Sequence, residues 1–138
     1  MPTLRVLLCT GQEAILEVLT RILRDDGCEI LPVSSTAEAL DKALQFGPNV
    51  LIIETIMPGV DGLRAAQRIV RETGCKALFL EPLHDIFSED GLTEYANGLR
   101  REVPGCDVLP IPFSRDHALA VVHSKVTGWS IAEKLRQS

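Results

Sequence analysis

The sequence predicts an α/β fold in which one parallel sheet is covered by helices on both faces. Short apolar runs alternate five times with segments whose apolar residues recur every three or four positions, the pattern of strands and helices in turn. Right-handed connections between parallel strands then distribute the helices over both faces in a doubly wound arrangement. The 138 residues fit one domain, 1–138, with a core at about 4–126 and a C-terminal helical extension at 127–138.

Five short runs are expected to form the strands of the sheet. The run NVLII at 49–53 is almost purely apolar, as in a strand that is buried on both faces of a parallel sheet. Pro110 lies inside the last run and has no backbone N–H, so this strand is expected at an edge. The expected strands are residues 4–9, 29–33, 49–53, 77–80 and 107–111.

Five segments with helical periodicity follow these strands. Ser35 with Glu38 three residues later forms a capping-box pattern, and Ser114 can cap the last helix. The segment 57–62 is expected to be a loop. An apolar stripe continues the last helix almost to the end of the chain through Ala118, Val122, Val126, Trp129 and Ala132. The expected helices are residues 12–26, 35–45, 63–72, about 92–103, and one that begins after Ser114.

Composition and charge exclude several classes of protein. The formal net charge is -5 and no block of Lys and Arg stands out, so no nucleic-acid partner is expected. The apolar runs are too short to span a bilayer, and no signal peptide is recognisable, so a cytoplasmic location without membrane binding is expected. Four scattered cysteines without a CxxC pair are expected to be reduced thiols.

Several motifs resemble one known family. Residues 49–62, NVLIIETIMPGVDG, are similar to the signature of response-regulator receiver domains, where an apolar strand ends in the phosphoacceptor aspartate and a Met-Pro-Gly-x-Asp-Gly loop follows. Ile111-Pro112-Phe113 resembles the family's Lys-Pro-Phe, and Glu38-Ala39-Leu40 matches a common feature of its second helix. The order of elements agrees from about Leu4 to His123. The resemblance implies a flavodoxin-like sheet of order 2-1-3-4-5 and a role in bacterial two-component (phosphorelay) signal transduction.

The residues that would carry phosphoryl transfer in this family are altered. The acidic pair that holds Mg²⁺ aligns with Thr10 and Gly11, although magnesium prefers carboxylate ligands. The phosphoacceptor aspartate aligns with Glu54, whose extra methylene displaces the carboxylate by about 1 Å. Phosphoryl transfer depends on positioning and on neutralising charge, so the resemblance implies a degenerate member of the family.

The positions that respond to phosphorylation in the family also differ here. The signalling Thr/Ser aligns with Glu81, the aromatic switch residue with Val108, and the lysine that pairs with the phosphoryl group with Ile111. The family's Lys-Pro bond is usually cis, so the resemblance implies a cis peptide bond before Pro112.

Glu54 leaves three interpretations open: a surviving acceptor, a constitutive mimic of the phosphorylated state, or a solvated remnant. The remnant is favoured because the Thr and Lys that would respond to the charge are absent. Glu54, Glu81 and His84 are weak candidates for a cation site, since carboxylates and imidazole can be ligands. Their spacing matches no motif, so an exposed acidic loop is the preferred interpretation, with no metal and no cofactor expected.

The function expected from the sequence is a receiver-like signalling module that acts by protein–protein interaction, without phosphorylation and without enzymatic activity. A histidine kinase or another regulator is the expected class of partner. Self-association through Val122, Val126 and Trp129 of the last helix is also expected, since aromatic residues are enriched at interface cores. The alternative is a small metal-dependent or nucleotide-binding enzyme on the same fold.

Overall fold

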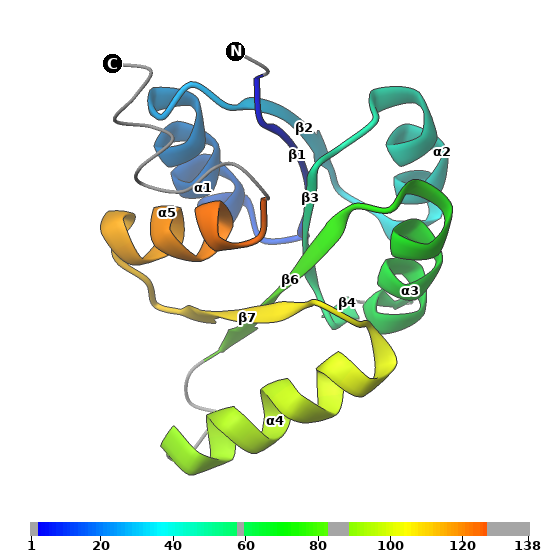
Figure 1. Ribbon diagram of the computed structural model, residues 1–138. Coiled ribbons are helices and arrows are strands. Elements are labelled where there is room, and N and C mark those ends of the chain that lie inside the picture. Colours follow the sequence, from blue (N-terminus) through cyan, green and yellow to red (C-terminus); the bar gives the residue numbers. More distant parts are fainter. Residues whose placement is uncertain (1–2, 58–59, 83–88, 127–138) are drawn as a thin grey trace.

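The computed structural model describes residues 3–57, 60–82 and 89–126 and contains a five-stranded parallel sheet (Figure 1). The strand order is β2-β1-β3-β6-β7, which confirms the order 2-1-3-4-5 expected from the sequence. β7, which contains Pro110, lies at an edge as predicted. The five strands are β1 (Arg5–Cys9), β2 (Glu29–Val33), β3 (Val50–Glu54), β6 (Lys76–Pro82) and β7 (Asp107–Ile111).

Helices cover both faces of the sheet, because alternate side chains of each strand point to opposite sides. In β3, Val50 and Ile52 pack in the cluster under α1 and α5, whereas Leu51 and Ile53 pack in the cluster under α2, α3 and α4. All four side chains are fully buried. The helices are α1 (Glu13–Asp25), α2 (Thr36–Phe46), α3 (Gly62–Thr73), α4 (Glu89–Glu102) and α5 (Arg115–Ser124).

Three local expectations are corrected by the structure. The segment expected as a loop contains a short antiparallel hairpin, β4 (Ile56–Met57) and β5 (Val60–Asp61). Ser35 is the N-cap of α2 but its side chain makes no capping hydrogen bond, so the capping box is not formed. α4 also begins about three residues earlier than predicted.

The last helix is shorter than its apolar stripe predicts. α5 ends at Ser124, and the next two residues form tighter turns in which the N–H of Lys125 and that of Val126 donate to carbonyls three residues earlier. Lys125 also pairs with Asp107 of β7 at 3.4 Å, which holds the chain against the sheet at this point. Val122 is fully buried within the chain, so its side chain is not accessible for the expected self-association. Trp129 and the extension 127–138 lie outside the described residues.

Two further observations concern the cysteines and the length of the helices. All four cysteines are buried, and none of them forms a disulfide within the part of the chain that the structure describes. Within the residues that the structure describes, none of the helices is both long enough and apolar enough to cross a lipid bilayer.

Candidate functional site

The candidate site lies at the edge of the sheet where the parallel strands end. Thr10 follows β1, Glu54 ends β3, Glu81 lies near the end of β6, and Ile111 ends β7. In doubly wound sheets, this carboxyl edge is where sites form. The structure therefore brings most of the residues singled out in the sequence to one edge.

Thr10 and Glu54 are joined directly. The Thr10 hydroxyl donates a hydrogen bond to Glu54 Oε1, and Thr10 Oγ1 itself accepts one from the backbone N–H of Gln12 at 3.1 Å. Thr10 is 2% exposed, so the bond is largely shielded from water. A hydroxyl can donate only one hydrogen bond, and that of Thr10 goes to Glu54. Gly11, the neighbouring position, is exposed and has no side chain to contribute.

The loop after Glu54 is held by Asp61 and Gly62. The Asp61 carboxylate caps α3 by accepting hydrogen bonds from the N–H groups of Leu63 and Arg64 at 3.0 and 3.3 Å. The Gly62 N–H donates to the carbonyl of Thr55 at 2.9 Å. A Cβ atom on Gly62 would collide with the backbone carbonyl of Glu54, so only glycine permits this close return of the chain.

Glu81 connects three elements. Its Oε1 accepts hydrogen bonds from Thr55 Oγ1 at 2.5 Å, just after β3, and from the Tyr95 hydroxyl of α4 at 2.7 Å. Glu81 is 7% exposed, and hydrogen bonds from two hydroxyl groups are the compensation that a buried carboxylate requires. Glu54 and Glu81 thus accept hydrogen bonds from different hydroxyl groups.

The remaining two positions are apolar and packed. Val108 is 6% exposed and lies in the cluster under α2, α3 and α4, opposite Phe79 of β6. Ile111 packs against the cluster on the other face. The Ile111–Pro112 peptide bond is cis, in agreement with the resemblance.

These side chains do not fit a magnesium site. Mg²⁺ requires near-octahedral oxygen ligands and usually one or two carboxylates, whereas here the Thr10 hydroxyl is engaged with Glu54 and Gly11 offers none. Across residues 3–57, 60–82 and 89–126, no three His, Cys, Asp or Glu side chains are grouped as metal ligands would be. His84 lies outside the described residues.

The thiol nearest this edge is unsuited to nucleophilic chemistry. Burial, and to a smaller extent the Glu54 carboxylate, raise the pKa of Cys9 to about 11. Because the thiolate is the nucleophile, a thiol with this pKa is almost entirely unreactive at neutral pH.

Sequence reasoning assigned no role to two residues of this site, Thr55 and Tyr95. Thr55 directly follows an expected strand end, so the sequence places it at the carboxyl edge without indicating that it donates to Glu81. Tyr95 is the single tyrosine of the chain and falls on a predicted helix. A buried glutamate near a strand end requires donors, and that requirement was the available signal for both.

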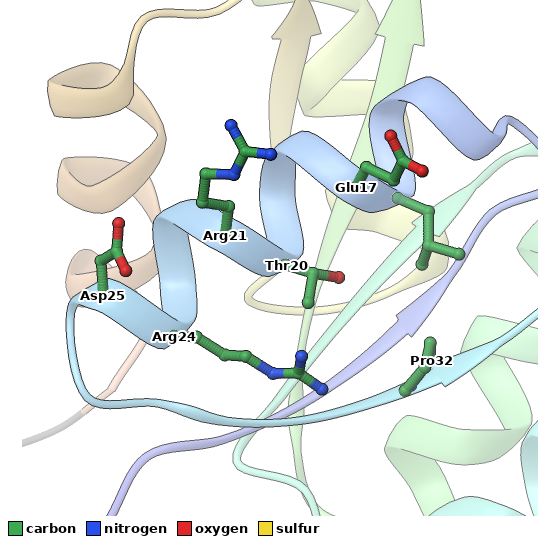
Figure 2. A pocket seen from close by; sticks show the side chains of 7 residues that line it. Glu17, Thr20, Arg21, Arg24, Asp25 and Pro32 are labelled. Atoms are coloured by element: carbon green, nitrogen blue, oxygen red, sulfur yellow. The ribbon is translucent and has the colours of Figure 1, made fainter.

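A groove of about 600 Å³ lies away from this edge, between α1 and β2 (Figure 2). The Arg24 side chain extends across it toward Pro32. Arg21 and Arg24 are accompanied by Glu17 and Asp25, so positive and negative charges balance among the lining residues. This groove therefore has no electrostatic preference for an anion or a cation.

The parallel sheet with a candidate site at its carboxyl edge defines a doubly wound α/β domain. The family model of the response regulator receiver domain matches residues 6–82, more than half of the chain, so the protein belongs to this family. It contains the receiver domain of two-component response regulators, a signalling module.

The chain matches some relatives over nearly their whole length and others over about half of it. Protein PilG of Pseudomonas aeruginosa is 25% identical over 127 residues, which cover 92% of this chain and 90% of PilG. Response regulator MprA of Mycobacterium avium is 29% identical over 117 residues, 85% of this chain but 48% of MprA, so the chain spans about half the length of that relative. The structure of the Vibrio cholerae chemotaxis protein CheY4 is similar, with a TM-score of 0.75 and 20% identity, covering 91% of this chain and 100% of CheY4. At that identity the likeness shows the fold.

Proposed function

We propose that this receiver domain signals through protein–protein interaction without being phosphorylated. The observation that carries the proposal is the hydrogen bond from Thr10 to Glu54, which stands where the family would hold Mg²⁺ next to its acceptor. Phosphoryl transfer needs a metal and a cation to neutralise the charge that develops on the phosphoryl group. Ile111, at the proposed lysine position, is apolar and packed against the core.

Glu54 is best described as a remnant of the acceptor position. A mimic of the phosphorylated state would need groups that respond to its charge. Thr10 provides one neutral donor to Glu54, and Ile111 provides none. At the proposed switch position, Glu81 is itself an anion and is held by Thr55 and Tyr95. These contacts support a fixed arrangement of the edge over a switched one.

The face formed by α4, β7 and α5 is the proposed contact surface, with a histidine kinase or another regulator as the class of partner. Asp107 at the start of β7 joins all three elements, since its two carboxylate oxygens pair with Arg100 of α4 at 3.0 Å and with Lys125 after α5 at 3.4 Å. Arg100 also donates to the carbonyl of Cys106 at 3.2 Å. A face fixed in this way presents one preformed surface to a partner, which reduces the entropic cost of binding.

The proposal is tested by treating the ¹⁵N-labelled chain with beryllofluoride or acetyl phosphate in the presence of Mg²⁺. No saturable amide shifts are expected around Glu54, and none at Thr10 or Ile111. A phosphorylatable receiver domain treated in parallel serves as the positive control for the reagents. Saturable shifts at the carboxyl edge that require Mg²⁺ would show that the chain accepts a phosphoryl group.

A further inference from the structure

A second groove, of about 650 Å³, lies between α2 and α3 and is lined by three arginines. Arg64, Arg68 and Arg71 are spaced by four and three residues, which places them on one face of α3. Asp61 is the single acidic residue among those that line the groove. The chain carries a net charge of -5, so this local excess of positive charge opposes its overall balance.

The arginine charges are weakly compensated within the described part of the chain. Arg64 approaches Asp61 at 3.9 Å, and both side chains are exposed, which makes the pair weak. For Arg68 and Arg71, the structure shows no ion pair with any described residue. The groove between α1 and β2 differs in composition, because two acids, Glu17 and Asp25, lie among its lining residues beside the two arginines (Figure 2).

The first turn of α2 contributes a second feature at the same groove. The side chain of its N-cap, Ser35, forms no hydrogen bond with the N–H groups of the turn, which carry the partial positive charge of the helix dipole. Thr36 lines the groove and is 6% exposed, yet its hydroxyl has no hydrogen-bond partner among the described residues. Buried hydroxyls are ordinarily paired, so this one indicates a missing partner.

We propose that the groove between α2 and α3 binds a small molecule of nucleotide size through its phosphate groups. Arginine side chains match phosphate oxygens with two parallel hydrogen bonds, and helix N-termini favour phosphate. The volume falls in the range of sites for small ligands. Leu40 and Ala65 provide apolar surface beside the charges, on which a planar base can pack. The site does not use Glu54 or Glu81, so it is independent of the function proposed above.

The test uses the full chain, titrated with pyrophosphate, ADP and adenosine and followed by ¹⁵N–¹H NMR. Pyrophosphate and ADP are expected to shift the amides of residues 36–38 and 64–71 in a saturable manner, and adenosine is expected to leave them unchanged. Arg68→Gln and Arg71→Gln should each weaken binding about tenfold, because each removes charge-assisted hydrogen bonds. Thr36→Val should weaken it without changing the charge.

Arg21→Gln is the matched control, since it removes one arginine from the groove between α1 and β2. It should leave the affinity for pyrophosphate unchanged, and the spectrum of each variant reports whether it is folded. The proposal is overturned if neither pyrophosphate nor ADP shifts these amides. It is also overturned if adenosine binds equally well, or if Arg21→Gln weakens binding as much as Arg68→Gln does.

Discussion

The hydrogen bond between Tyr95 and Glu81 allows a quantitative test of the site. Tyr95→Phe removes the hydroxyl that donates to Glu81 Oε1 at 2.7 Å and keeps the ring. A hydrogen bond to a charged group contributes about 1.5–3 kcal/mol. Tyr95 is 37% exposed and Thr55 still donates to the same oxygen, so water and Thr55 compensate in part. We therefore expect Tyr95→Phe to lower the free energy of unfolding by about 1–2 kcal/mol.

The assay is urea denaturation at pH 7.5, carried out as a double-mutant cycle with Glu81→Leu. In the Glu81→Leu background the Tyr95 hydroxyl has lost its acceptor, so Tyr95→Phe should have little further effect. The two substitutions should be coupled by about 1 kcal/mol or more, which is within the range found for residues in contact. Arg101→Gln, an exposed change on the same helix, is a control for general effects on α4.

Equal losses from Tyr95→Phe in both backgrounds would refute this reasoning. That result would mean that the stability contributed by the Tyr95 hydroxyl does not come from its hydrogen bond to Glu81. Other contacts would then hold α4 at the carboxyl edge. The proposed fixed state of the edge would then lose its support at position 81.

Three further predictions concern other parts of the fold. Gly62→Ala should destabilise the chain by about 1–3 kcal/mol or more in thermal or urea unfolding, because its Cβ meets the Glu54 carbonyl. Gly98→Ala, in α4 with open space around it, should instead raise the free energy of unfolding by about 0.5–1 kcal/mol. Similar losses of stability in Gly62→Ala and Gly98→Ala would contradict the close approach at Gly62. In the same unfolding assay, Thr10→Val should lower the free energy of unfolding by about 1–3 kcal/mol, because valine leaves Glu54 without its donor. Thr10→Ser keeps the hydroxyl and should lower it much less. The pKa of Cys9 is raised from 9.0 to about 11 in the folded chain. The contribution of this thiol to the free energy of unfolding is therefore complete below pH 9 and is lost as pH rises through 11. Between pH 8 and 10.5, the free energy of unfolding in urea should therefore fall more for the wild type than for Cys9→Ala. An equal dependence on pH in the two proteins would count against a buried neutral thiol.

The sheet could be predicted from the sequence because its signal is repeated along the chain. The run at 49–53 is apolar at every position except the first, and the structure buries β3 on both faces. Pro110 predicted an edge strand from the loss of a single N–H, and β7 is at the edge. These inferences depend on burial and backbone hydrogen bonding, which each strand expresses locally.

The details that failed depend on competition between local and tertiary contacts. Ser35 and Glu38 have the spacing of a capping box, but spacing does not determine where the Ser35 hydroxyl points. The apolar stripe predicted that the last helix continues without a break past Ser124, whereas α5 ends there and Lys125 pairs with Asp107; the helical extension at 127–138 stays a prediction. The donors to Glu81 are 26 positions before it and 14 after it in the sequence, so only the folded chain brings them together.

The motif that identifies the family has structural roles that are independent of phosphorylation. Asp61 caps α3, and Gly62 allows the chain to pass close to the Glu54 carbonyl. Both residues build the connection from β3 to α3, and that connection is needed whether or not a phosphoryl group is ever attached. The positions at which the family would hold its metal ligands and its lysine, Thr10 and Ile111 here, lie after β1 and at the end of β7 and have no such role in the loop. A chain can therefore keep the loop and the fold while the residues around Glu54 change, and so the match at 49–62 is strong support for the fold and weak support for phosphoryl transfer.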